Sequence, residues 1–175
     1  ERFIREGGRG MVGVHAAFTC ADDTLEASAD LAQRLGVGVH IHVSEDLVDA
    51  DAGSRLQSRA RDDWLLVHCV HLDRPLPGTI AHNSRSNMNN AVGVADIDGM
   101  LRAGMRVCLG NDGFSNAMWE DWKTAYLLHK IWARNPRRAN GMSITQMAIH
   151  NNAALASVFF PDTPPGMLVP GAAAD

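Results

Sequence analysis

Histidines and carboxylates that could bind a metal ion or move protons stand at the ends of short apolar runs in this 175-residue sequence. Neutral imidazole and carboxylate are the usual protein ligands of Zn²⁺ and Fe²⁺. Because side chains two apart on a strand point to the same face, His40 and His42 can both face one site. Glu45 follows just beyond, where its carboxylate can reach a metal-bound water and a substrate nitrogen. The other residues of this kind are His15, His68, His71, His82 and Asp112.

Segments of strand and helix character alternate along the chain and decide where these side chains can lie. The predicted strands are the apolar runs at 11–17, 38–43, 64–70, Thr79–His82 and 105–110. Helical spacing of apolar residues occurs at Asp22–Leu35, 94–103, Met118–Ala133 and 143–158. Strands that are apolar on both faces and alternate with helices indicate a parallel α/β sheet. Because the carboxyl ends of parallel strands meet at one edge, where active sites lie, we expect the strand-end side chains to converge there.

Each of these residues also has a simpler interpretation. A lone histidine at a strand end is more often a hydrogen-bonded core or turn residue than a ligand. Asp112-Gly113 by itself is typical of a turn. His, Glu and Asp at the ends of several separate strands are hard to obtain by chance, which favours a common site. His129 and His150 fall inside predicted helices and are interpreted as structural or surface residues.

Composition excludes several classes of protein. Apolar residues make up 46% and charged residues 21%, as in an ordinary globular domain. A formal charge of −4 predicts no nucleic-acid partner. The apolar runs are too short for a membrane span, and residues 1–10 do not resemble a signal peptide. The odd count of three cysteines argues against a disulfide framework, so we expect a reducing, cytoplasmic setting.

Five motifs at these strand ends carry a family resemblance. They are His-Ala-Ala-Phe-Thr (15–19), His-Val-Ser-Glu (42–45), Val-His-Cys-Val-His (67–71), His-Asn with Ser-Asn-Met-Asn-Asn-Ala-Val-Gly (82–83 and 86–93) and Leu-Gly-Asn-Asp-Gly (109–113). In order and approximate spacing they resemble the second half of an amidohydrolase-superfamily barrel, in its cytosine-deaminase-like, ATZ/TRZ-type branch and closest to the SsnA type. The resemblance implies an α/β fold that forms about strands four to eight of a metallo-dependent-hydrolase TIM (β/α)₈ barrel over residues 1–160. Residues 161–175 would then be a tail leading towards an absent C-terminal β-sandwich.

The resemblance also implies a reaction. A metal-activated water attacks a trigonal carbon and breaks a C–N bond other than a peptide bond, as in deamination. One divalent metal ion, Zn or Fe, and a small nitrogen-heterocycle or amidine-like substrate are expected. Glu45 would shuttle a proton to the leaving nitrogen, Asp112 would accept one from water, and His68 would steady the attacking hydroxide. The implied roles are metal ligands His42 and Asp112, catalytic residues Glu45, His68 and Asp112, and substrate-binding residues His15 and His82.

The metal site implied in this way is incomplete. The family takes two more ligands from a His-x-His at strand one, whereas the only such motif here, His40–His42, matches strand five. Two protein ligands fall short of the three typical of catalytic zinc. An inactive partial or degenerate relative with a binding role is therefore an alternative. A further alternative is an unrelated α/β hydrolase that uses His40, His42, His68 and Asp112 as a full set.

Two structural expectations follow from the same comparison. Residues 72–78 are too few and too rich in proline to form a crossover helix before the strand at Thr79–His82. A half-barrel also leaves the edge strands on both sides without partners, which favours pairing with another chain. We therefore expect the chain by itself to be unstable or to form a homo-oligomer.

Overall fold

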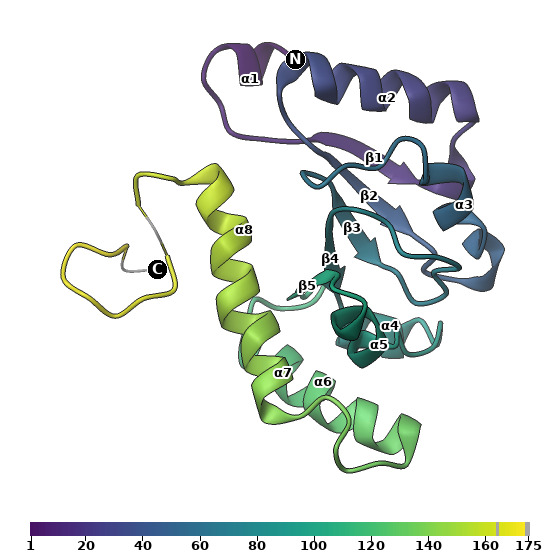
Figure 1. Ribbon diagram of the computed structural model, residues 1–175, viewed down its shortest axis with the longest axis vertical. Helices are drawn as coiled ribbons and strands as arrows, with labels where there is room; N and C mark the ends of the chain where they lie inside the picture. Colours follow the sequence, from purple (N-terminus) through teal and green to yellow (C-terminus); the bar gives the residue numbers. More distant parts are fainter. Residues whose placement is uncertain (164, 174–175) are drawn as a thin grey trace.

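The computed structural model describes residues 1–163 and 165–173, and its centre is a five-stranded parallel sheet (Figure 1). The strands follow one another across the sheet in chain order, and each pairs in parallel with the next. This confirms the predicted α/β class and parallel arrangement. The strands are β1 (Val12–Ala16), β2 (Val39–Val43), β3 (Leu65–His68), β4 (Thr79–His82) and β5 (Arg106–Leu109).

Helices connect these strands and flank the sheet. They are α1 (Arg2–Arg5), α2 (Asp22–Leu35), α3 (Ala52–Leu56), α4 (Ser84–Asn89), α5 (Ile97–Arg102), α6 (Met118–Ala133), α7 (Gly141–Thr145) and α8 (Asn152–Phe159). Two short 3₁₀ turns are η1 (Ala17–Thr19) and η2 (Leu47–Asp49). The predictions for α2 and α6 are confirmed, whereas α1, α3 and α4 were not predicted. These three contain only four to six residues each, too few for apolar periodicity to be visible.

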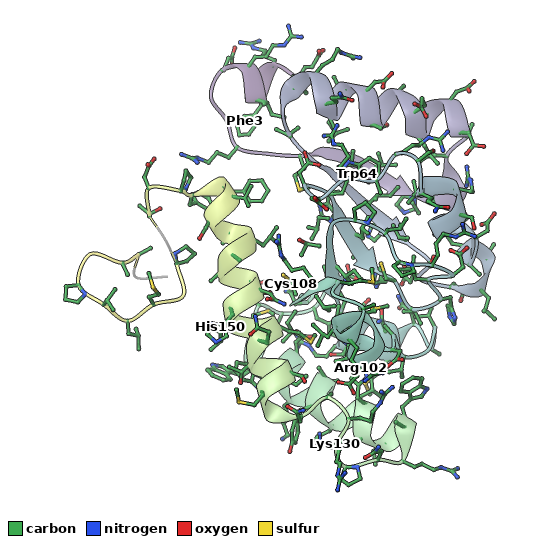
Figure 2. All side chains as sticks on the ribbon, in the orientation of Figure 1. Phe3, Trp64, Arg102, Cys108, Lys130 and His150 are labelled. Carbon is green, nitrogen blue, oxygen red and sulfur yellow. The ribbon has the colours of Figure 1, made fainter. Side chains whose placement is uncertain are left out.

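The segment predicted as a single helix at 143–158 is helical throughout, but it is not one regular α-helix. The helical segment begins at Gly141, because the Asn140 side chain caps it by accepting from the Ser143 N–H at 3.1 Å. A π-helical turn, η3 (Gln146–Asn151), then separates α7 from α8. In Figure 2 the His150 side chain extends from this turn away from the sheet.

Side chains from η3 and α8 occupy the outer edge of β5, beside which α8 runs in Figure 1. The Asn152 amide accepts from the Leu109 N–H and donates to the Leu109 carbonyl, both at 3.0 Å. Asn151 donates to the Val107 carbonyl at 2.7 Å. As expected, β5 pairs with no strand on this side, but the chain's own amides cover part of its edge.

Strand alternation divides the residues of β2 between two environments. Val39, Ile41 and Val43 are fully buried in the core that also contains Leu25 and neighbouring residues of α2. His40 and His42 alternate with them and therefore point to the opposite face. Trp64, just before β3, is the largest fully buried side chain and lies below α2 in the view of Figure 2.

The connection from β3 to β4 contains no helix, as predicted. It ends at Gly78, whose φ of +121° and close approach to the Trp64 carbonyl leave no room for a Cβ. Residues 161–163 and 165–173 run as turns and irregular backbone, and the domain boundary predicted at 160/161 stays a prediction. Within the part of the chain that the structure describes, no helix is long and apolar enough to cross a membrane.

Candidate active site

Five predicted site residues meet at the carboxyl ends of the strands. The rings of His42 and His68 stack with centroids 5.4 Å apart, and His15 meets His42 edge-on at 5.6 Å. Nε2 of His68 lies 3.4 Å from Oε2 of Glu45 and 3.8 Å from Oδ2 of Asp112. As expected, these residues lie close together at the carboxyl ends of the strands.

His68 reaches this group through an unusual backbone conformation. It is in register with Val43, whose side chain lies in the buried core, so simple alternation would put His68 on that same face. A φ of 70° at His68 breaks the alternation, and the ring stacks on His42 instead. Non-glycine residues in this left-handed region are uncommon and cluster at functional sites.

Three more residues beside the site share this conformation: Ser44 has a φ of 49°, and Cys69 and Asp112 each have a φ of 52°. The turn at Ser44, directly before Glu45, is held by Asp49, whose Oδ2 accepts from the Ser44 N–H at 2.7 Å. Burial raises the pKa of Asp49 despite that hydrogen bond. The backbone that presents Glu45 and Asp112 is therefore fixed by specific turns rather than by strand geometry.

His42 and Asp112 each have one polar atom engaged and one left for a ligand. Nδ1 of His42 hydrogen-bonds the His15 carbonyl, which leaves Nε2 for a ligand. Metal-binding histidines commonly donate their other N–H in this way. Oδ2 of Asp112 accepts from Oγ of Ser86 at 2.5 Å, which leaves Oδ1. The donor types suit a divalent metal ion. Among residues 1–163 and 165–173, however, no three His, Cys, Asp or Glu side chains are arranged to hold one.

His15 is exposed at the end of β1. Its Nδ1 lies 3.2 Å from the Thr19 hydroxyl, which itself donates to the Ala16 carbonyl at 2.9 Å. Because that hydroxyl hydrogen is already used, Nδ1 of His15 has to be the donor, and Nε2 is left as an acceptor. An exposed acceptor beside His42 is compatible with the predicted substrate contact, which stays a prediction.

His82 is not brought into this group. It is fully buried at the end of β4, and its Nε2 lies 3.1 Å from Nε2 of His129 on α6. Burial, with smaller contributions from His129 and His68, lowers the pKa of His82 to about 3. Burial likewise lowers the pKa of His129 to about 4. The substrate role predicted for His82 gains no support from this position, because alternation at the strand end directs the side chain toward α6.

His40 lies on β2 with its ring 6.5 Å from that of His42. Burial, and secondarily His42, lowers its pKa. As the residue two positions before His42, it faces the same side of the sheet but lies further from the strand end.

The residues that sequence reasoning missed lie on α4 and directly after it. Ser86 donates to Asp112, as described above. Oδ1 of Asn87 hydrogen-bonds Nδ1 of His68 at 2.8 Å. Asn90 donates to Oε1 of Glu45 at 3.1 Å. The available signal was the polar run 83–90, which directly follows a strand and contains no apolar residue except Met88.

Comparison with known proteins gives a consistent result. A family model described as "Amidohydrolase family" matches residues 1–156. The chain is 33% identical to the 5'-deoxyadenosine deaminase of Methanosarcina acetivorans, over 94% of this chain and 42% of that protein. It is also 33% identical to the 5-methylthioadenosine/S-adenosylhomocysteine deaminase of Pelotomaculum thermopropionicum, over 99% of this chain and 46% of that protein.

A solved structure extends the comparison to the fold. The zinc-containing adenosine deaminase of Xanthomonas campestris superimposes with a TM-score of 0.77 at 25% identity, over 93% of this chain and 42% of that one. The five strands are thus part of a TIM barrel. The chain spans less than half the length of these relatives, 42% to 46%. As its sequence and fold together establish, the chain belongs to the amidohydrolase family.

Proposed function

We propose that this chain takes part in the metal-dependent hydrolysis of a non-peptide C–N bond, in which a small nitrogen heterocycle loses an amino group as ammonia. The observation that carries the proposal is the position of His68, whose Nε2 lies between the carboxylates of Glu45 and Asp112 and whose ring stacks on His42. Two carboxylates and two imidazoles at the carboxyl ends of the strands can accept, hold and return a proton, which is what hydrolytic deamination requires.

One divalent metal ion, zinc or iron, belongs to this proposal. Nε2 of His42 and Oδ1 of Asp112 would hold it, because these atoms remain after the bonds to His15 and Ser86. When bound, such an ion lowers the pKa of a water molecule enough to give a nucleophile near neutral pH. Catalytic zinc typically has three protein ligands, so the complete set needs a ligand beyond these two.

The chain's own residues would move the protons. Asp112 accepts a proton from the attacking water as the new C–O bond forms. Glu45 delivers a proton that comes from the attacking water to the leaving nitrogen, so that the C–N bond breaks and ammonia departs with the electron pair. When His68 carries a second proton, on Nε2, it donates a hydrogen bond from Nε2 to the oxygen that becomes negative at the tetrahedral carbon. The buried position of His68, 1% exposed, strengthens that interaction because water does not compete.

We propose an aminopurine nucleoside as the substrate class. The support is that the relatives described above are named as deaminases of adenosine derivatives. His15 would contact the substrate through its exposed Nε2. The cytoplasm remains the proposed compartment, since all three cysteines are free thiols and a reducing setting maintains them.

The test is ammonia release from adenosine, 5'-deoxyadenosine and 5'-methylthioadenosine by the zinc-loaded chain. Glu45→Gln keeps the shape of the side chain but cannot shuttle a proton, so turnover should fall about 10²- to 10⁴-fold. The matched control is Asp46→Asn, an exposed neighbour that should leave turnover unchanged. Absence of ammonia release with all three compounds would contradict the proposal and favour the inactive, binding-only alternative.

A further inference from the structure

Residues 84–90, which form α4 and the position after it, hydrogen-bond three side chains of the proposed site, those of Glu45, His68 and Asp112. One of these residues, Asn87, can determine which ring nitrogen of His68 carries the hydrogen. We propose that Asn87 is a positioning residue that keeps a hydrogen on Nδ1 of His68, so that His68 acts only through Nε2. This inference deepens the proposed function and rests on the role given there to His68.

The geometry of the contact defines the donor. Oδ1 of Asn87 lies 2.8 Å from Nδ1 of His68. An amide oxygen can only accept, so Nδ1 has to carry the hydrogen. Both side chains are 1% exposed, and solvent water therefore does not compete for either group. The hydrogen bond made by one ring nitrogen of a histidine determines what the other can do.

The hydrogen bond at Nδ1 determines what Nε2, on the opposite side of the His68 ring, can do. Nε2 lies 3.4 Å from Glu45 and 3.8 Å from Asp112, so it faces the groups between which a proton would travel. With Nδ1 committed to Asn87, any proton that His68 gains or loses is exchanged at Nε2. This holds for the neutral and the charged ring alike, because Nδ1 keeps its hydrogen in both.

Asn87 can fix His68 because α4 is itself held in place. Arg85 donates to Oδ2 of the fully buried Asp121 on α6 at 2.5 Å and to the Ser115 carbonyl at 2.7 Å. Ser86 holds Asp112 from the adjacent position. Consecutive residues of one short helix thus contact α6, Asp112 and His68, which couples the orientation of the last two.

The amide orientation of Asn87 is the feature that could reverse the inference. In the present orientation Oδ1 contacts His68, and Nδ2 is buried with no hydrogen-bond partner among the described residues. With the amide turned round, Nδ2 would donate to Nδ1, and the ring hydrogen would move to Nε2. The two arrangements place the hydrogen on different ring nitrogens and are distinguishable by spectroscopy.

The experiment is a long-range ¹H–¹⁵N correlation spectrum of histidine rings in the metal-free, ¹⁵N-labelled chain. It is recorded at about pH 8, above the ordinary histidine pKa of about 6.5. His68 is assigned by the signals that disappear in His68→Gln. We expect Nδ1 of His68 to resonate as a protonated nitrogen and Nε2 as an unprotonated one. The reverse pattern in the unmodified chain would overturn the proposal without any variant.

Variants separate positioning from packing. In Asn87→Ala, Nδ1 of His68 should shift toward the unprotonated position, whereas Asn87→Asp keeps an acceptor and should restore the protonated signal. Asn89→Ala, on the exposed side of the same helix, is the matched control and should change nothing. Circular dichroism establishes that each variant is folded. An unchanged Nδ1 signal in folded Asn87→Ala would refute the role of Asn87.

Neither metal nor substrate enters these measurements. Failure of the deamination assay would therefore leave the spectroscopic result intact. Conversely, an unprotonated Nδ1 in an active protein would reject the role of Asn87 while the proposed reaction stood.

Discussion

The ring of His68 stacks on the ring of His42, 5.4 Å between centroids, although the two residues come from strand positions that should face opposite sides of the sheet. The left-handed backbone at His68 makes this pairing possible. Strain of this kind costs about 1–3 kcal/mol and persists only where the surroundings hold it. Asn87 on one side and the stacked His42 on the other supply that support.

His42 and His40 are expected to differ sharply in zinc binding. His42→Ala removes the imidazole at the strand end and should weaken zinc affinity by at least the roughly 10- to 100-fold seen when residues supporting a metal site are lost. His40→Ala, two positions earlier on the same face, is the matched control and should bind zinc like the unmodified chain. Competition against a chromogenic chelator measures both. Equal loss in the two variants would support the alternative in which His40 completes the ligand set.

Removal of the Ser86 hydroxyl should also reduce zinc affinity. In Ser86→Ala the Asp112 carboxylate loses its 2.5 Å hydrogen bond and is free to rotate, so the affinity should fall about 10- to 100-fold. Ser28→Ala deletes a hydroxyl that bonds only within α2, to Thr24, and serves as the control. The same chelator competition applies. An affinity in Ser86→Ala equal to that of the control would mean that Ser86 does not orient Asp112.

The His82–His129 pair should make the fold sensitive to acid. Burial lowers the pKa of His82 to about 3 and that of His129 to about 4, whereas the unfolded histidines titrate near 6.5. The unfolded chain therefore takes up protons first. The free energy of unfolding is highest above about pH 6.5 and declines as the pH falls toward 4, by on the order of 3 kcal/mol for each histidine.

Urea denaturation at a series of pH values measures this decline. His129→Gln removes one of the two titrating groups and should flatten the pH dependence by about half. The exposed His150 provides the control, since His150→Gln should leave the slope as it was. The other charged groups that act on His129 are Asp96, Asp98, Lys130 and Arg138. A slope that is the same in His129→Gln as in the unmodified chain would assign the acid sensitivity to those groups.

The amides on the edge of β5 should stabilise the fold. In Asn152→Ala the N–H and carbonyl of the buried Leu109 lose their partners, which should lower the free energy of unfolding by about 1–3 kcal/mol. Static light scattering should also show more association, because the strand edge is uncovered. Asn89→Ala is again the exposed control. Unchanged stability and association would show that the edge does not depend on these bonds.

Much of this protein could be predicted from the sequence alone. Alternating apolar runs and helical periods determined a parallel α/β sheet, and the clustering of His, Glu and Asp at strand ends indicated where the site lies. Both depend on side-chain periodicity and on the geometry of parallel strands, which are local properties. The helix-free connection before β4 could be predicted for the same reason, since its length and prolines are visible in the sequence.

Only the tertiary structure decided which of these residues meet. His82 and His68 both end a strand, yet His82 turns to His129 on α6 while the backbone of His68 turns its ring to His42. The contacts from Ser86 and Asn87 likewise join positions distant in the sequence. Periodicity predicts which face a strand residue takes, but the backbone dihedral at a strand end and the packing of a distant helix determine where that last side chain points.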